Sequence, residues 1–434
     1  MSDAEEEIEE PDNSQNDSAN FITPEGRRNI YALSSAAFFN DTGSDMLTPA
    51  YSTFMTSVIN APQWIIGLLD SLSMLFGALL SPLGGKLSDK KGRKIFIWIG
   101  YILLMISRGT QALANVWSHL VGPKIIYEFG RGIRNPAREA MITEDIPEKK
   151  RGWAFGLLQS ADSTGAILGP TLGYLLWNIF LYSLGWNIEK ASRILIGIAA
   201  VPTILSVLII LIFVRDLRRR KENPEKEVDP RVTEANHPDN KKQQFENKPV
   251  FIFIIILVVI LFLGIPTESL LLTMAQDRYG YTGDTMFILF FFFNLFYALV
   301  AYPAGVLSDK YGARIVFMIS TAFLVLFGIL SAVNQTGSLY FTIPTLMIFG
   351  IFRGSIFPPM MKLVAKIIPR DRRGEMMGTF SMFRIGSQIA SPFILGGLFS
   401  ISSSTQYLPY VFICILAASI ICMMIFAPKI LKNN

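Results

Sequence analysis

Two acidic residues lie in the middle of the first apolar stretch of the chain. In FFNDTGSDMLTP (residues 38–49), Asp41 and Asp45 are four positions apart, so a helix places both carboxylates on one face. A charge at the centre of a membrane-spanning helix costs about 2.5–3.5 kcal/mol on insertion scales and usually marks a proton, ion or substrate pathway. We therefore predict that this pair takes up and releases a proton, and we favour Asp41. The alternative is that both residues only pair with cations of a neighbouring helix.

Further charged residues recur at helical spacing in the fourth apolar segment and in two segments of the second half. Steps of three and four residues keep the first group largely on one helix face, which must look away from lipid. The predicted cavity residues, besides the two aspartates, are Glu128, Arg131, Arg134, Arg138, Glu268 and Arg353. The arginines either contact an anionic substrate or neutralise the acids. Ordinary interhelical pairing is expected for five other charges: Asp70, Arg108, Asp162, Lys362 and Arg384.

The composition favours an all-α polytopic membrane protein. Hydrophobic residues make up 51% of the chain, Phe alone numbers 33, and only 17% of residues are charged. A helix needs roughly 20 residues to cross the hydrocarbon core. We expect twelve transmembrane helices, at about 30–57, 62–84, 95–115, 117–145, 153–179, 192–214, 250–275, 284–307, 315–334, 338–367, 374–401 and 407–427.

The distribution of Lys and Arg predicts the topology. Basic residues cluster in the connections after even-numbered spans, whereas the connections around 58–61, 115, 335–337 and 402–406 carry no Lys or Arg. The positive-inside rule then places both termini in the cytoplasm, in the cytoplasmic membrane. The predicted organisation is a disordered acidic tail, a six-helix bundle, a charged cytoplasmic linker, a second six-helix bundle and a short cytoplasmic tail, at 1–28, 29–214, 215–249, 250–428 and 429–434.

The two halves of the chain repeat each other. GGKLSDKKGRK (84–94) and AGVLSDKYGAR (304–314) align when Asp89 is placed on Asp309, an offset of 309 − 89 = 220. A second stretch aligns Arg131 with Arg353 at 353 − 131 = 222. Two parallel repeats predict two pseudo-symmetric bundles related by an axis along the membrane normal, with the substrate site at their interface.

The connection after the second span carries a motif of a known family. Its residues are Gly85, Leu87, Ser88, Asp89, Lys90, Gly92, Arg93 and Lys94. With the repeat and the central linker, this pattern resembles the major facilitator superfamily over nearly the whole chain, and the stretch at 38–49 resembles a group of prokaryotic permeases within it. We expect Gly85 and Gly92 to allow a tight turn between helices. The resemblance implies a cytoplasmic gate in which these residues act with Asp309, and Glu144 and Asp145 are expected as structural partners.

A glycine pattern in the fifth span resembles the antiporter motif of proton-coupled exporters in that superfamily. Its residues are Gly156, Gly165, Gly169, Pro170 and Gly173, while Tyr174 stands where a further glycine is usual. The alternative is plain close packing, because small residues at four-residue spacing let a neighbouring helix approach closely.

These observations favour a secondary transporter that moves a small organic solute by alternating access, with proton-coupled efflux as the leading hypothesis. One alternative is a proton symporter that imports an anionic metabolite, and another is a transporter-like receptor or sensor. Neither a nucleophile–base arrangement nor a metal-ligand spacing stands out, so no enzyme activity, cofactor or metal is expected. The expected partners are the solute, H⁺ and the lipid bilayer, with no nucleic acid, and the chain is expected to be a monomer.

Overall fold

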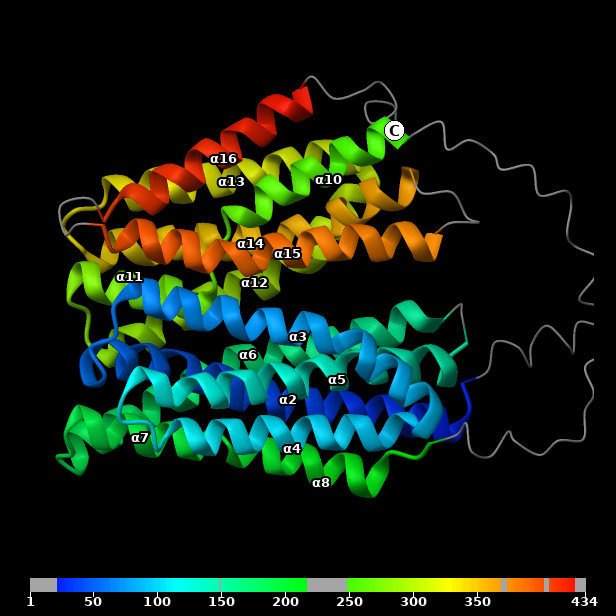
Figure 1. Cartoon of the computed structure of the whole chain (residues 1–434), viewed down its shortest axis with the longest axis horizontal. Coiled ribbons are helices and arrows are strands. Elements are labelled where there is room, and N and C mark those ends of the chain that lie inside the picture. The colour runs from blue at the N-terminus through cyan, green and yellow to red at the C-terminus, as the bar shows by residue number, and fades with distance from the viewer. Residues whose placement is uncertain (1–21, 148–149, 217–247, 368–372, 402–405, 426–434) are drawn as a thin grey trace, which may run out of the picture.

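The computed structural model describes residues 22–147, 150–216, 248–367, 373–401 and 406–425. Most of the predicted acidic tail and linker and the whole predicted C-terminal tail lie outside these ranges. The described chain folds into helices only, and these form two bundles that lie one above the other in Figure 1. The predicted all-α architecture of two six-helix bundles is thereby confirmed.

The first bundle contains the first six spans. Its helices are α2 (Pro24–Thr53), α3 (Gln63–Lys91), α4 (Arg93–Gln111), α5 (Val121–Asp145), α6 (Arg151–Asn178), α7 (Ile188–Ile198) and α8 (Val201–Phe213). The first helix begins at Pro24, earlier than the expected residue 30, because Thr23 caps it. The Thr23 hydroxyl accepts a hydrogen bond from the Gly26 amide, and proline suits the first helical position.

The second bundle follows the same order. Its helices are α10 (Lys248–Leu263), α11 (Glu268–Tyr279), α12 (Gly283–Tyr311), α13 (Ala313–Val333), α14 (Leu339–Ile367), α15 (Arg373–Phe399) and α16 (Leu408–Ile425). Counted with their interruptions, the described helices of the two bundles make twelve spans.

Two spans are interrupted, which the sequence-based ranges did not anticipate. The sixth consists of α7 and α8, and the seventh consists of α10 and α11, with residues 264–267 between them. Pro266 has no amide proton to donate, and Thr267 caps α11 by accepting a hydrogen bond from the Leu270 amide at 3.3 Å. Irregular backbone at this depth is tolerated where it lines a cavity, and residues 265–267 do line one.

The predicted loop after the second span is a turn of one residue. Helix α3 continues to Lys91 and α4 begins at Arg93, so Gly92 alone connects them, with φ +97°. The expected role of Gly85 in the turn is wrong, because the helix continues through it. Gly312 connects α12 to α13 in the same way, with φ +90°. Such backbone angles favour glycine, and their recurrence at an offset of 312 − 92 = 220 supports the internal repeat.

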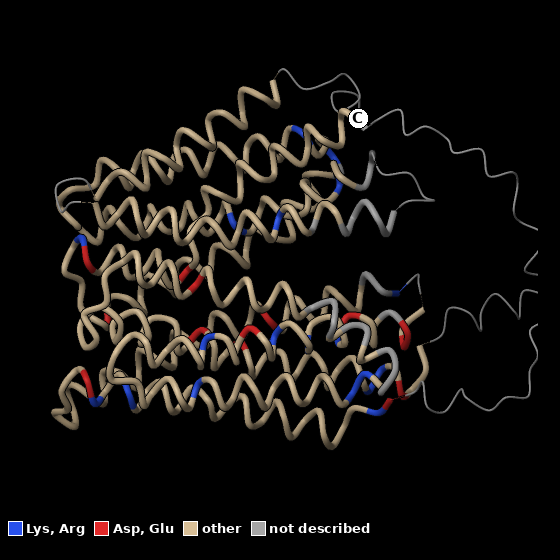
Figure 2. Tube along the Cα trace, viewed as in Figure 1, with Lys and Arg blue, Asp and Glu red and all other residues tan. Residues whose placement is uncertain are grey.

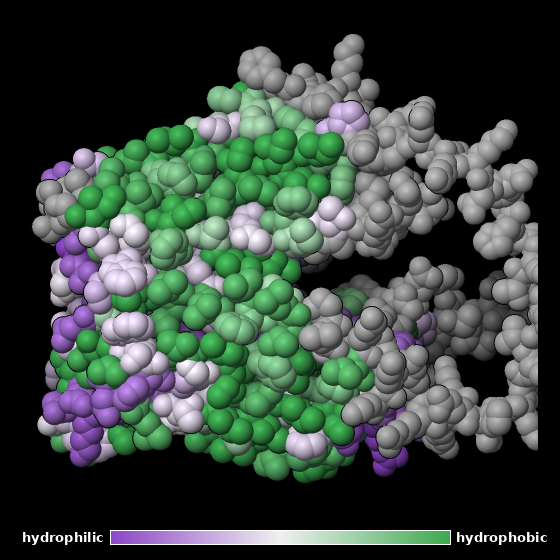
Figure 3. All heavy atoms as spheres, in the orientation of Figure 1, coloured by the Kyte–Doolittle hydropathy of each residue, from purple (hydrophilic) through white to green (hydrophobic). Residues whose placement is uncertain are grey.

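Among the described residues, eight spans are long and apolar enough to cross a membrane by length and composition. Large apolar side chains such as Leu79, Ile212 and Ile415 are exposed on the outside of the bundles, and Figure 3 shows the apolar belt that such residues form. The other four spans, α2, α4, α5 and α15, each contribute a charged residue to the space between the bundles.

The bundles meet at the end away from the central linker. Gln63 on α3 donates to the Thr273 carbonyl oxygen at 3.1 Å, and the Thr273 hydroxyl donates to Gln63 Oε1 at 2.9 Å. The Phe393 amide donates to the Ser71 hydroxyl at 3.1 Å. At the opposite end, where the first bundle ends at α8 and the second begins at α10, the space-filling view shows a hollow between the bundles (Figure 3).

Candidate functional site

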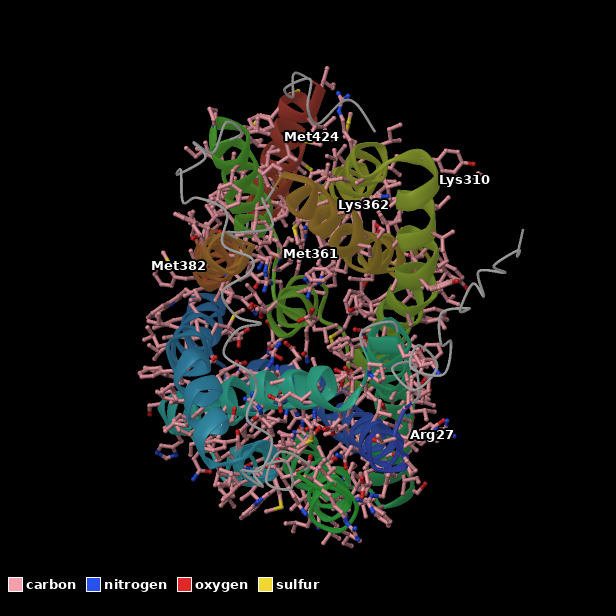
Figure 4. The ribbon with its side chains drawn as sticks, turned by 90° about the vertical axis from the view of Figure 1, so that its right-hand side faces the viewer. Arg27, Lys310, Met361, Lys362, Met382 and Met424 are labelled. Atoms are coloured by element: carbon pink, nitrogen blue, oxygen red, sulfur yellow. The ribbon has the colours of Figure 1, made fainter. Side chains whose placement is uncertain are left out.

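A cavity of about 810 Å³ lies between the two bundles. Helices α2 to α6 form one wall, and α10, α11, α12, α14 and α15 form the other. Figure 2 shows acidic and basic positions midway along several of these helices. Figure 4 views the molecule from the linker end, with α3 and α15 on one side and α6 and α12 on the other. Of the predicted cavity residues, the lining includes Asp41, Asp45, Glu128, Arg131, Glu268 and Arg353.

Arg134 and Arg138 do not line this cavity. The Arg134 guanidinium lies 4.6 Å from the centre of the Tyr101 ring on α4 and donates to Asn135 Oδ1 at 2.9 Å. Arg138 is buried near the end of α5. A three-residue step turns a helix by about −60°, so two successive steps from Glu128 carry Arg134 off the cavity face. For these two arginines, the prediction from helical spacing alone that they line the cavity is wrong.

The two aspartates of α2 form no ion pair with any residue that the structure describes. Asp41 accepts a hydrogen bond from its neighbour Asn40 at 2.8 Å. Asp45 makes no hydrogen bond or ion pair within the part of the chain that the structure describes, although it lines the cavity. Its charged neighbours at longer range are the acids Asp41, Glu268 and Asp162 and the cation Arg108. These contacts therefore do not support the alternative, in which the two aspartates pair directly with cations of the fourth span.

Arg131 and Arg353, which are equivalent in the repeat, each pair with a glutamate. Arg131 Nη1 lies 3.4 Å from Glu128 Oε1 on the same helix. Arg353 Nη2 on α14 lies 2.5 Å from Glu268 Oε1 at the start of α11. Both arginines therefore neutralise acids of the cavity wall, which was one of the two roles predicted for them.

A three-residue contact joins the bundles beside the interruption of the seventh span. Asp70 on α3 forms an ion pair with Lys124 on α5, as expected of an interhelical pair. The second carboxylate oxygen of Asp70 accepts a hydrogen bond from the Thr267 hydroxyl at 2.6 Å, across the bundle interface. Sequence reasoning missed Thr267, although its position after a proline is typical of a helix cap.

Arg108 and Lys362, for which interhelical pairing was expected, donate hydrogen bonds to neutral groups of neighbouring helices. Arg108 donates to Thr203 on α8 and, at 3.2 Å, to Asn40 Oδ1 on α2. Lys362 on α14 donates to the Ser308 carbonyl oxygen on α12 at 2.9 Å. These contacts join helices within one bundle.

Asp162 on α6 and Arg384 on α15 do not form the expected ion pairs. Both line the cavity, and neither pairs with an opposite charge within the described chain. Asp162 Oδ1 is buried and has no hydrogen-bond partner among the described residues. Arg384 donates only to Gln388 Oε1 on its own helix, at 3.2 Å. The expectation of ordinary pairing is therefore wrong for both residues, because their side chains open toward the cavity instead of toward a neighbouring helix.

The glycine motif of α6 packs against the part of α2 that carries Asp41 and Asp45. A Cβ atom added at Gly165 would lie 3.3 Å from Asp41 Cβ, and one added at Gly169 would lie 2.6 Å from the Thr42 carbonyl oxygen. Gly173 instead faces the Phe287 ring of the second bundle. Gly156 has open space beside it, so it does not share this role. Pro170 is buried inside α6 and is its one internal proline. These contacts match the packing interpretation of the motif.

We expect Gly169→Ala to destabilise the protein by about 1–3 kcal/mol, because the new methyl group meets backbone atoms of α2 that cannot move aside alone. Transport should fall as well, since α2 carries both aspartates. The measurement is thermal unfolding of purified protein together with solute uptake by vesicles. Gly156→Ala is the matched control, and it should leave both quantities unchanged. Equal effects of the two substitutions would contradict the packing role.

The predicted gate residues form a cluster at the linker end of the first bundle. Arg93 donates to Glu144 Oε1 and to the Ser88 hydroxyl, both at 2.8 Å. Asp145 accepts a hydrogen bond from Asn29 on α2 at 2.6 Å. Lys94 donates to the carbonyl oxygen of residue 211 at 2.8 Å. The expected contact between a basic residue of the motif and Glu144 is present, whereas the side chains of Asp89 and Asp309 lie outside the described residues.

Comparison with known proteins agrees with this fold. The sequence pattern of the Major Facilitator Superfamily matches residues 33–295 and 269–433. An uncharacterized MFS-type transporter of Methanocaldococcus jannaschii is 30% identical over 397 residues, which cover 88% of this chain and 91% of that protein. The multidrug resistance protein MdtG of a Rahnella species is 25% identical over 401 residues, covering 87% and 88%. The quinolone resistance protein NorA of Staphylococcus aureus is 25% identical over 338 residues, covering 77% and 81%.

Solved structures share the architecture at low sequence identity. A bacterial homolog of the human lysosomal transporter Spinster, in an inward-facing and occupied conformation, aligns with a TM-score of 0.73 at 16% identity, over 94% of this chain and 98% of that one. A D-xylose–proton symporter aligns with a TM-score of 0.73 at 16% identity, over 94% and 99%. Because the family pattern matches both halves and the first relative matches nearly end to end, the chain belongs to the Major Facilitator Superfamily of membrane transporters.

Proposed function

We propose that this transporter exports a small organic solute across the cytoplasmic membrane in exchange for protons. The observation that carries the proposal is Asp45, a carboxylate that lines the cavity between the bundles without a hydrogen bond or ion pair in the described chain. A carboxylate that no cation neutralises can exist in the protonated form at low cost and can lose its proton when water or a substrate reaches it. Asp45 is therefore suited to carry a proton between the two sides.

The contacts favour Asp45 over Asp41 as the proton carrier, although the sequence alone favoured Asp41. The Asp41 carboxylate is held by a hydrogen bond from its neighbour Asn40. Asp45 has no such donor. Its position next to Gly169, where α6 packs against the residues on either side of it, supports a link between its protonation and the position of α6.

Two further observations support the direction and the orientation. Relatives named for multidrug and quinolone resistance match most of the chain, and export is the transport direction that confers resistance. The basic connections of the sequence lie at the end where the cavity opens, so the positive-inside rule makes this end cytoplasmic. The described conformation is then open to the cytoplasm, ready to receive a solute from inside the cell.

The test uses purified protein in vesicles with an imposed pH gradient. We expect vesicles with an acidic lumen to accumulate norfloxacin, a quinolone, or the cation ethidium beyond the level of protein-free vesicles, because outward proton flow drives solute entry. The protein-free vesicles report passive redistribution of the two compounds. Accumulation only when the outside is acidic would identify a symporter, and uptake that ignores the gradient would contradict proton coupling.

A further inference from the structure

The charged residues of the cavity are distributed unequally between its two walls. The first bundle contributes the acids Asp41, Asp45, Asp70, Glu128 and Asp162 against the bases Arg108, Lys124 and Arg131. The second bundle contributes one acid, Glu268, against Arg353 and Arg384. Contact ion pairs join Asp70 to Lys124, Glu128 to Arg131 and Glu268 to Arg353. Among the described residues, the first wall is left with an excess of acid and the second with one cation, Arg384, that has no ion pair.

Asp162 is the acid of the first wall that most needs a partner. Its Oδ1 atom is buried and lacks a hydrogen bond, and a buried polar atom in this state costs free energy. Asp41 lies within electrostatic range and repels it, while Arg134 and Arg138 attract it from outside the cavity without contact. Because Asp162 also lines the cavity, a cationic group of a bound solute would neutralise this carboxylate.

Arg384 is the complementary group on the second wall. Its guanidinium lies 5.7 Å from the centre of the Phe262 ring, and its one hydrogen bond within the described chain goes to the neutral Gln388. The charged groups that act on it at longer range, Arg353 and Arg131, are both cations. Most of its planar set of N–H donors therefore stays open to an acceptor such as a carboxylate.

These two residues occupy equivalent positions of the repeat with opposite charges. Asp162 and Arg384 are separated by 384 − 162 = 222, the offset that also aligns Arg131 with Arg353. Helix α6 packs against α2 and α12, whereas α15 packs against α3 and α10, so the two residues stand on opposite sides of the cavity. Phe290, Phe293 and Phe357 also line the space. The cavity thus has a negative side, a positive side and apolar surface.

We propose that the cavity selects a zwitterionic solute with an apolar or aromatic body, whose amine faces Asp162 and whose carboxylate faces Arg384. This inference rests on the proposed transport function and specifies its solute class. A solute with both charges forms an ion pair with each of the two residues, whereas a purely cationic or purely anionic solute pairs with only one of them. The separation of the two charges across the cavity sets the orientation of the bound molecule.

The experiment measures binding with three compounds that share one aromatic body. Norfloxacin is a zwitterion near neutral pH, its ethyl ester keeps only the amine charge, and its N-acetyl derivative keeps only the carboxylate. Fluorescence anisotropy of each compound is titrated with the purified full-length protein in lipid nanodiscs. We expect norfloxacin to bind at least about tenfold more tightly than either derivative, since a hydrogen bond to a charged group contributes that much or more. Equal affinities for all three compounds would overturn the proposal.

Variants assign each charge to its residue. Arg384→Gln should remove the advantage of norfloxacin over its ester, and Asp162→Asn should remove its advantage over the N-acetyl derivative. Lys310→Gln removes a cation of the same bundle that lies at the outer edge in Figure 4, and it should change neither ratio. An advantage that survives both cavity substitutions would also overturn the proposal. The comparison of compounds on the unmodified protein remains decisive where a variant fails to fold.

The outcome separates this inference from the proposed transport function. Charge-selective binding without gradient-driven uptake would support the inference and contradict proton-coupled export. Gradient-driven uptake of all three compounds at equal rates and affinities would support export and overturn the zwitterion site.

Discussion

Replacing Asp45 by asparagine is expected to abolish solute accumulation driven by a pH gradient, down to the level of protein-free vesicles. Asparagine has nearly the same shape but cannot carry a proton between the two sides. The same variant should still exchange solute for solute at equal pH, because that reaction needs no net proton movement. Vesicle uptake with and without a gradient measures both quantities.

The fold of this variant should be intact, which makes the result interpretable. Asp45 makes no ion pair or hydrogen bond in the described chain, so its replacement by a neutral residue takes no interaction away from another group. Thermal unfolding should therefore occur at the temperature of the unmodified protein or above it. Asp41→Asn is the matched control on the same helix face, and it should retain more of the accumulation. Full accumulation by Asp45→Asn would assign proton coupling to another residue.

Replacing Asp70 by asparagine is expected to destabilise the protein by about 3–5 kcal/mol. Asp70 is buried, and its loss would leave the Lys124 ammonium, whose side chain is 17% exposed, without its counter-ion. Breaking one partner of a buried ion pair has this cost because the remaining charge is poorly solvated. The measurement is thermal unfolding of purified protein in detergent.

Two further variants identify the cause. In Asp70→Asn/Lys124→Met the stranded charge is removed, so most of the stability should return. Glu128→Gln is the matched control, because Arg131, its partner, is half exposed, and such pairs contribute only about 0–1 kcal/mol. A single Asp70→Asn variant as stable as Glu128→Gln would show that the Asp70–Lys124 pair does not hold the bundle.

Composition, helical spacing and the internal repeat were enough to predict several features of the molecule. The repeat, the order of the spans and the acids of the first span follow from residue types alone. Interhelical pairing of Asp70 was also expected, because buried charges need partners, but its partner Lys124 came from the structure. Pro266 could have suggested the interruption of the seventh span before Thr267. Because the apolar run around it has membrane-spanning length, the sequence analysis predicted one continuous helix instead.

The remaining features depend on contacts between distant residues. Helical spacing placed Arg134 on the cavity face, but the drift of successive three-residue steps turns it to Tyr101. Neither Asp162 nor Arg384 differs in type from residues that pair across helices. Only the arrangement of α6 and α15 across the cavity, rather than side by side, leaves both of them open. The repeat offset of 222 makes Asp162 and Arg384 equivalent positions of the two halves. No feature of the sequence, however, distinguished this pair from the other charged residues.

The single-residue turns at Gly92 and Gly312 have a mechanical consequence. A connection of one residue has no slack, so α3 cannot slide along α4, nor α12 along α13, without distorting the turn. Each pair of helices must therefore tilt as one rigid body. When the cavity closes at the linker end and opens at the other, the bending must therefore be absorbed elsewhere. The interruption between α10 and α11 is one place in the second bundle where the helical hydrogen bonding is already broken.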